Sequence, residues 1–256
     1  MKMFVIIQQI FDPAKVRVTS QGRVVTEGAS RIIEPASKAA LEEALAIRDT
    51  CGGSVDVVAV GGPELEDSLR EAQAIGADHA YLVSDPSASG GDAYANAALL
   101  SAAIRHAGGA DVVLVGEGGA LSGPMIAEFL GLPQITHASH ARIDAIGRLL
   151  ADQAWDSGVR QAAADLPVLL TVAEGANSPR YAHSARVMSV FSEPTLTMWT
   201  LADIGVEESA AGAHGAKTQV RRTTAPDARA FGEKLTGTPQ EQASSLVGKL
   251  RARGIL

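Results

Sequence analysis

Cysteine is almost absent: Cys51 is the single thiol in a chain of 256 residues. One thiol cannot form a disulfide within the chain, and it cannot build a metal site from several cysteines. Aromatic residues make up 4% of the sequence, and lysine and arginine (22) are fewer than aspartate and glutamate (29). The net charge of −7 argues against a nucleic-acid partner, because such proteins concentrate lysine and arginine on one surface.

Long apolar runs are also missing, and no stretch approaches the roughly 20 residues that span a bilayer. Residues 1–7 are too few for the apolar region of a secretory signal. We therefore expect no direct membrane insertion and a cytoplasmic location, which suits a protein with one free cysteine. The apolar content of 46% is still sufficient for a substantial buried core.

The common catalytic and nucleotide-binding motifs are absent: G-x-G-x-x-G after a strand, G-x-x-x-x-G-K-[ST], H-E-x-x-H and G-x-S-x-G. His137 and His140 have no third ligand nearby in the sequence, so we interpret them as a solvated loop pair rather than a metal site. Residues 89–92 (Ser-Gly-Gly-Asp) resemble part of the phosphate loop of ATP pyrophosphatases, but Asp85 and Pro86 precede them in place of a strand.

What the sequence does contain is an alternation of strand-like and helix-like segments. Strand patterns occupy residues 4–10, 15–25 (a hairpin), 55–60, 80–83, 112–116, 141–150 and 162–172. Helix patterns occupy residues 36–51, 63–75, 93–106, 124–130 and 240–252. Strands that alternate with helices form βαβ units, so we expect an α/β fold with a doubly wound, mainly parallel sheet.

The periodic pattern ends near residue 191. Residues 193–237 contain scattered alanine, glycine and threonine, and a segment that cannot bury an apolar face of its own usually lies along something else. We therefore divide the chain into an α/β domain, residues 1–190, and a C-terminal arm, residues 191–256, that packs on a partner.

Six segments resemble, in the same order, those of electron transfer flavoprotein beta subunits. They are residues 5–13 (V-I-I-Q-Q-I-F-D-P, followed by V-R-V), 34–45 (E-P before A-L-E-E-A-L), 62–78 (G-P before A-I-G-A-D), 127–134 (A-E-F-L-G-L-P-Q), 166–172 (L-P to T-V) and 177–181 (N-S-P-R-Y). The last segment is the most specific. Because the six keep their order over nearly the whole chain, coincidence is a poor explanation.

The resemblance implies an adenine-nucleotide-hydrolase-like fold and a heterodimer. In that family a larger alpha subunit holds most of one FAD, and the beta subunit adds a wall near the flavin. The pair passes electrons from a flavoprotein dehydrogenase to a quinone oxidoreductase, so we expect an electron carrier without substrate turnover of its own. The arm from residue 191 is then expected to pack on the alpha subunit.

The resemblance also implies a cofactor-binding set in the loops around the strand ends. Its members are Phe11, Asp12, Pro13, Ala36, Gly61, Gly116, Gly118, Gly119 and Ser122. The residues after the first strand approach the flavin ring in relatives. For Asp12 and Pro13 an ordinary turn start is an equally good interpretation.

One departure from the family concerns a structural AMP. Most relatives carry D-x-D-x-x-Q in the loop that wraps its phosphate, whereas residues 117–123 here are shortened and lack these residues. Gln8 replaces the usual lysine, and Glu34 replaces the usual asparagine and adds a negative charge. Gly118, Gly119 and Ser122 could still bind an anion through backbone N–H groups. We favour a merely shortened turn and expect little or no AMP.

A second departure concerns the surface that docks the electron-donating dehydrogenase. Relatives present an exposed Leu-Pro followed by several lysines, and here Ser184 and Ala185 stand in place of Leu-Pro. We therefore expect a dedicated flavoprotein dehydrogenase, one that oxidises an amine, rather than a general acyl-CoA dehydrogenase. The expected docking residues are Arg180, Tyr181, His183, Ser184, Arg186, Val187 and Met188.

A third departure is Ala154, which occupies the position of an acidic residue that pairs with the alpha subunit in relatives; Asp152 on the same strand face is the expected substitute. Trp155 and Trp199 are interpreted as packing residues rather than flavin stackers.

Two other classes of protein stay open. An adenine-nucleotide-binding module of the stress-protein type has no need of the arm. An ATP pyrophosphatase needs an acidic metal-binding pair.

Overall fold

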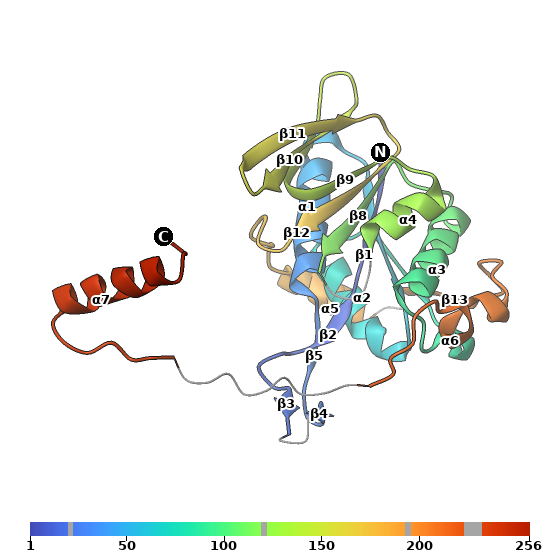
Figure 1. Ribbon diagram of the computed structural model, residues 1–256. Coiled ribbons are helices and arrows are strands. Elements are labelled where there is room, and N and C mark those ends of the chain that lie inside the picture. Colours follow the sequence, from blue (N-terminus) through green and yellow to red (C-terminus); the bar gives the residue numbers. More distant parts are fainter. Residues whose placement is uncertain (20–22, 119–121, 193–195, 223–231) are drawn as a thin grey trace. The chain divides into compact units, whose positions relative to one another are not determined.

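The computed structural model of the chain describes residues 1–19, 23–118, 122–192, 196–222 and 232–256 (Figure 1). These residues form two compact units. The first comprises residues 1–17 and 25–221, and the second comprises residues 18–24 and 222–256. We describe each unit separately, and the candidate site lies entirely in the first.

A nine-stranded sheet forms the centre of the first unit, with the order β11-β10-β9-β12-β8-β1-β6-β7-β13 among the described residues. The strands are β1 (Lys2–Ile6), β6 (Ser54–Val60), β7 (His79–Val83), β8 (Val112–Glu117), β9 (Gln134–Ile143), β10 (Leu149–Trp155), β11 (Gly158–Ala164), β12 (Val168–Ala173) and β13 (Leu196–Trp199). Pairing is parallel from β9 through β13 and antiparallel in β9-β10-β11. The predicted α/β fold with a mainly parallel sheet is therefore confirmed.

Helices cover both faces of this sheet (Figure 1). The helices of the first unit are α1 (Pro35–Cys51), α2 (Glu66–Ile75), α3 (Ala93–His106), α4 (Gly123–Leu130), α5 (Ser184–Ser192) and α6 (Gly212–Gly215), and α7 (Pro239–Ala252) belongs to the second unit. One apolar core joins α1 and α2 to the sheet, and a second joins α3 and α4 to the opposite face. Strands buried on both faces are rich in apolar residues, as β6, β8 and β12 are, although Asp56 interrupts β6 and Thr171 interrupts β12.

Small antiparallel ribbons complete the strand inventory of the described residues. β2 (Gln9–Phe11) pairs with β5 (Arg31–Ile33) beside the carboxyl end of β1, and β3 (Arg17–Val18) pairs with β4 (Val24–Val25). The hairpin predicted at residues 15–25 is confirmed by β3 and β4. The predicted strand 4–10 is two strands, because β1 ends at Ile6 and β2 begins at Gln9.

Two predicted strands were wrong because each contains a turn. Residues 141–150 cross a turn in which Asp144 Oδ1 accepts the N–H groups of Ile146 and Arg148. Residues 162–172 cross from β11 to β12 through Pro167, which cannot donate a hydrogen bond to a sheet. Apolar alternation continues through both turns, so periodicity alone did not reveal them.

The prediction that residues 193–237 lack regular structure was wrong for β13. Leu196–Trp199 pairs in parallel with β7, and the Trp199 ring stacks on Tyr81 with ring centres 4.5 Å apart. Trp199 is thus a packing residue, as predicted. Trp155 is 58% exposed, so the same prediction was wrong for Trp155. The chain remains within the first unit through Arg221.

The second unit contains α7, whose first turn is fixed by its own residues. Thr238 Oγ1 accepts the N–H of Glu241, and the Glu241 carboxylate accepts the N–H of Thr238. Such a capping box satisfies two helix N-terminal groups locally. The packing of residues 191–256 on a partner subunit stays a prediction. Over the described residues, no helix combines the length and apolar content needed to cross a membrane.

Candidate functional site

The order of the parallel strands marks where a ligand is expected. From β1 the chain adds β6 and β7 on one side, and it then returns to place β8 on the other side of β1. In open α/β sheets, ligands bind outside the carboxyl ends of the strands at such a reversal. The loops after β1, β6 and β7 line the hollows found at this edge.

A cleft of about 580 Å³ opens at the carboxyl ends of β6 and β7. Its lining residues are Val60, Gly61, Gly62, Pro63, Glu64, Ser84, Asp85, Pro86, Ala88, Ser89, Gly90, Gly91 and Asn96. A hollow of about 230 Å³ shares Val60, Gly61, Glu64 and Asn96 with it, and adds Ile6, Ile7, Gln8, Gln9, Arg31, Leu65 and Leu100. We call the two together the carboxyl-edge cleft. Gly61, from the predicted cofactor set, lies in its wall.

A buried carboxyl group stands beside this cleft, at the start of α1. Glu34 is 6% exposed, and its Oε2 accepts hydrogen bonds from Gln8 Nε2 (3.0 Å) and Ser37 Oγ (3.2 Å). Burial raises the pKa of Glu34 above its ordinary value; the Ser37 bond opposes this and the Glu174 carboxylate adds to it. Glu34 and Gln8 thus form an internal pair where β1 ends.

Gly116, a predicted glycine on β8, packs closely against the first turn of α1. A side chain on Gly116 would meet the backbone of Ala36 and Ser37 within 2.3–2.6 Å, so glycine permits the close packing of α1 on β8. At Gly118, φ is +149° and a Cβ atom would lie 3.4 Å from Glu34 Oε1. Ala36 is 1% exposed.

Gly119 lies outside the described residues, and Ser122 precedes α4 without a capping hydrogen bond from its side chain. The cofactor-binding roles of Ala36, Gly116, Gly118 and Ser122 therefore stay predictions, as does that of Gly119. Gly116 in addition has a packing role that the sequence did not reveal.

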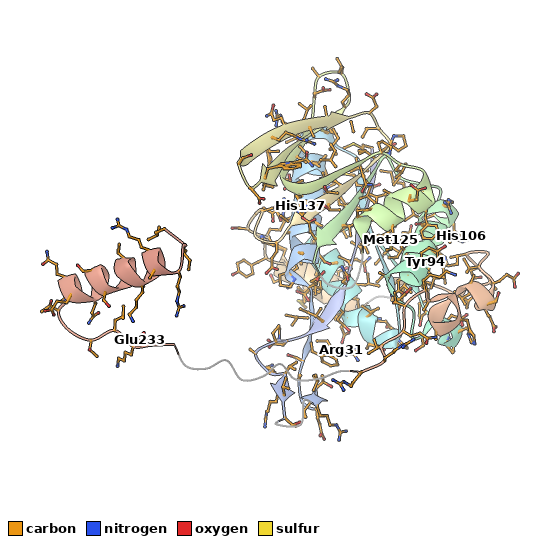
Figure 2. All side chains as sticks on the ribbon, viewed as in Figure 1. Arg31, Tyr94, His106, Met125, His137 and Glu233 are labelled. Atoms are coloured by element: carbon orange, nitrogen blue, oxygen red, sulfur yellow. The ribbon has the colours of Figure 1, made fainter. Side chains whose placement is uncertain are left out.

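The segment after β2 presents a wall at the surface. Phe11 and Asp12 are half-buried and Pro13 is exposed. The Arg31 guanidinium lies 4.8 Å from the centre of the Phe11 ring (Arg31 is labelled in Figure 2). Asp12 Oδ1 accepts the N–H of Ala14 at 3.0 Å, which is the ordinary turn role. The role of Phe11, Asp12 and Pro13 as a wall of a flavin site stays a prediction.

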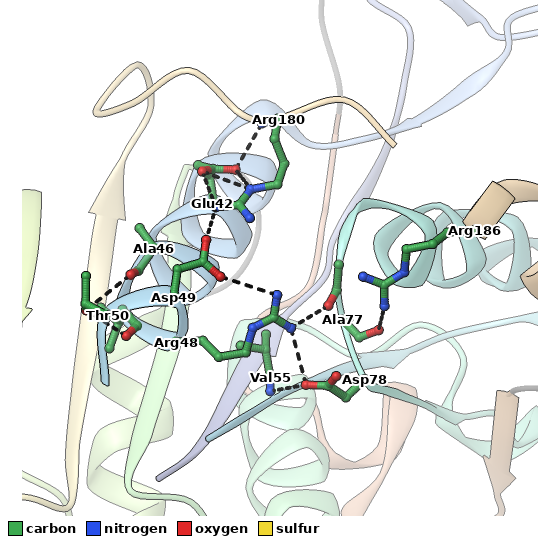
Figure 3. A network of polar contacts seen from close by, with 12 residues as sticks. Glu42, Ala46, Arg48, Asp49, Thr50, Val55, Ala77, Asp78, Arg180 and Arg186 are labelled. Carbon is green, nitrogen blue, oxygen red and sulfur yellow. Dashed lines mark hydrogen bonds and ion pairs between the residues drawn. The ribbon is translucent and has the colours of Figure 1, made fainter. Parts of the chain in front are cut away.

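Arg180 is engaged inside the chain (Figure 3). Its Nε and Nη2 atoms donate to the Glu42 carboxylate at 2.9 Å each, its N–H donates to the same group, and Nη2 lies 2.9 Å from Asp49. These bonds raise the pKa of Arg180, and the side-chain hydrogen bond with Glu42 contributes most to this increase. Arg186 Nη2 donates to the carbonyl of Ala77 at 3.3 Å. Both predicted docking cations thus also hold the loop after β12 and α5 in place.

The other predicted docking residues lie at an exposed surface on and before α5, which we call the α5 surface. Tyr181 is 97% exposed, Met188 73% and Val187 36%, and His183 and Ser184 are also exposed. Phe191, 52% exposed, extends the same surface but was missing from the predicted set. Its helical spacing of three and four residues from Met188 and Val187 was the available signal.

The comparisons with known proteins agree with the resemblance. A family model described as "Electron transfer flavoprotein domain" matches residues 21–195. The chain belongs to the electron transfer flavoprotein family. It is 35% identical over 262 residues to the electron transfer flavoprotein subunit beta of Thermoanaerobacterium thermosaccharolyticum, with all of both chains covered.

Two further relatives of this electron transfer flavoprotein chain carry other names. It is 38% identical over 249 residues to Protein FixA of Azorhizobium caulinodans, covering 92% of this chain and 88% of that one. It is 34% identical over 264 residues to the caffeyl-CoA reductase-Etf complex subunit CarD of Acetobacterium woodii, with all of both chains covered.

In this family member, residues 89–92 serve the fold. Asp92 Oδ1 accepts the N–H of Ala95 and caps α3, and its Oδ2 accepts the N–H groups of Lys217 (2.8 Å) and Thr218 (2.7 Å). These bonds, led by that of Ala95, lower the pKa of Asp92 to about 2. The segment therefore anchors residues 217–218, and a carboxylate already occupies the helix N-terminus.

The interpretation of His137 and His140 as a loop pair was wrong, because both lie in β9. His137, labelled in Figure 2, places Nδ1 2.6 Å from Glu117 Oε2. His140 Nδ1 lies 3.2 Å from Glu43 Oε1. Across the described part of the chain, no three histidine, cysteine, aspartate or glutamate side chains gather as a metal site.

The Asp152 carboxyl has one buried oxygen without a hydrogen bond, and its contact with an alpha subunit stays a prediction.

Proposed function

We propose that this chain is the beta subunit of a heterodimeric electron transfer flavoprotein. It passes electrons from a flavoprotein dehydrogenase to a quinone oxidoreductase or another acceptor. The observation that carries the proposal is the match over the full length of chains named as this subunit, at 34–35% identity. The name of CarD, a subunit of a reductase-Etf complex, supports assembly with a second flavoprotein.

The residues of this chain fit a shared flavin site better than a complete one. Phe11 and Pro13 offer one wall, and Gly116 on β8 packs closely against α1. FAD bound mainly by the alpha subunit supplies the reversible uptake and release of electrons. The task of this chain is then to cover one side of the flavin, to exclude water there and to dock the partners. It is proposed to act as a carrier subunit and not as an enzyme.

The proposed docking site for the donor is the α5 surface. Exposed apolar side chains at helical spacing suit a small interface, where one or two buried anchors carry most of the binding energy. The proposed donor is a dedicated flavoprotein dehydrogenase that oxidises an amine. The support is the absence of a Leu-Pro anchor, since Ser184 and Ala185 occupy those positions.

The test is reduction of the flavin by a donor. The chain is copurified with its alpha partner, and bleaching of the flavin absorbance is followed anaerobically with an amine-oxidising dehydrogenase encoded nearby and with a general acyl-CoA dehydrogenase. We expect rapid reduction by the first and slow reduction by the second. A flavin that accepts electrons from neither enzyme contradicts the proposed function.

A further inference from the structure

Two neighbouring glutamates on α1 hold the short segment that leads into α5. Glu42 accepts the forked hydrogen bonds of Arg180 (Figure 3). The next residue, Glu43, accepts a hydrogen bond from Asn177 Nδ2 at 3.0 Å on its Oε2 atom. Asn177 Nδ2 also donates to the carbonyl of Ala39 on the same helix, at 3.0 Å. Both ends of this segment, Asn177 and Arg180, are therefore attached to α1 shortly before the α5 surface begins.

The Glu43 side chain joins three parts of the fold. Glu43 is 3% exposed, and its Oε1 accepts the N–H of Ala141 in β9, beside the register shift between β9 and β10. His140 Nδ1 lies 3.2 Å from the same oxygen. A buried carboxyl group needs partners of this kind, because the loss of its hydration is costly. One side chain of α1 thus links β9 to the loop after β12.

Asn177 has a feature that stability alone does not explain. Its Nδ2 has two acceptors, but its Oδ1 is buried and has no hydrogen-bond partner among the described residues. A buried oxygen without a partner costs free energy. The fold thus accepts a cost at the residue that ties the loop to α1, and this favours a positioning role for Asn177.

We propose that Glu43 and Asn177 are positioning residues for electron entry: their hydrogen bond fixes the α5 surface in the conformation that docks the donor dehydrogenase. Glu43 is buried, so it acts through the loop and not by contact with the donor. Arg186 gives α5 a second attachment through the carbonyl of Ala77. A surface that is already held in its bound conformation loses less entropy on binding. The inference rests on the proposed function, since it names residues that serve its docking step.

The test is the dependence of flavin reduction on donor concentration. Asn177→Ala is introduced into the FAD-loaded heterodimer, and anaerobic bleaching per FAD is measured with whichever of the two donor dehydrogenases reduces the unmodified heterodimer faster. The half-maximal donor concentration should rise about tenfold while the maximal rate stays within about twofold, the pattern of lost binding. An unchanged half-maximal concentration overturns the inference, and so does a fall in the maximal rate alone.

A second variant identifies the hydrogen bond itself. Glu43→Gln offers one acceptor oxygen in place of two, so it cannot accept from both Asn177 and Ala141, and it should also raise the half-maximal concentration. The double variant should bind the donor no more weakly than the worse single variant, because both changes remove one bond. Effects that add in full contradict a shared hydrogen bond.

A control variant separates positioning from a general loss of stability. Ile104→Val shortens a buried side chain of α3, on the opposite face of the sheet from α1. It should lower the urea midpoint and leave the half-maximal donor concentration unchanged. A rise equal to that of Asn177→Ala overturns the inference. An unmodified heterodimer that neither donor reduces contradicts the proposed function instead, so the two failures are distinguishable.

Discussion

At the residue scale, this chain uses carboxyl groups internally where an anion could have bound. Glu34 hydrogen-bonds to Gln8 and Ser37, and Asp92 holds the backbone of Lys217 and Thr218. The sequence revealed that Glu34 adds a negative charge. It could not reveal that the carboxyl is buried, because burial depends on how closely α1 packs on β8.

The buried Glu34 carboxyl predicts a pH dependence of stability. Its pKa is raised in the folded chain, so folding is favoured by protonation and the carboxylate destabilises the fold above the ordinary value of 4.5. Glu34→Gln should therefore raise the free energy of unfolding at pH 8, and the gain should shrink as the pH falls toward 4.5. Urea unfolding at a series of pH values measures this. A gain that is constant with pH contradicts the assignment.

Arg180 provides a second residue-scale prediction. Arg180→Ala removes the contacts with Glu42 and Asp49 and should lower the free energy of unfolding by about 1–2 kcal/mol, since charged hydrogen bonds that are partly exposed contribute modestly. Arg180→Lys keeps the charge but loses the forked geometry and should restore less than half. Urea midpoints give the comparison, and Arg142→Gln on exposed β9 is the control. An unchanged midpoint for Arg180→Ala would falsify the claim that its contacts with Glu42 and Asp49 stabilise the fold.

At the element scale, apolar periodicity predicted the strands that are buried on both faces, and helix signals predicted α1, α2, α3 and α4. It failed where the chain turns at Asp144 and at Pro167, because apolar residues continue on both sides of each turn. It also missed β13, because a strand of four residues at the sheet edge has no periodicity of its own. The cleft itself depends on loops that meet only in the folded chain.

The α5 surface carries the element-scale prediction on partner choice. Ser184→Leu with Ala185→Pro places an exposed leucine at the start of α5, and burial of such a side chain contributes roughly 1.5–3 kcal/mol, or about one to two decades in affinity. Reduction of the heterodimer by a general acyl-CoA dehydrogenase should become faster at limiting donor concentration. If the unmodified heterodimer is already reduced as fast as a typical family member, the surface is not selective.

At the scale of the whole molecule, the chain forms an α/β unit and a second unit, which comprises residues 18–24 and 222–256 and contains α7. The helix has its own capping box and carries exposed Leu246 and Val247, while the first unit presents the exposed α5 surface and the proposed flavin wall. Surfaces of this kind are explained by partners and not by internal chemistry. Family membership could be recognised from six short segments, whereas the packing of the second unit on a partner subunit stays a prediction.

The central claim is that this chain completes a flavin site together with a second subunit. The most direct measurement is the FAD content of the chain expressed alone and of the chain coexpressed with its alpha partner, by visible absorbance and by chromatography of the released flavin. The account predicts a colourless chain alone and about one FAD per heterodimer. Tight, stoichiometric FAD in the isolated chain, or a coexpressed pair that holds none, would contradict it.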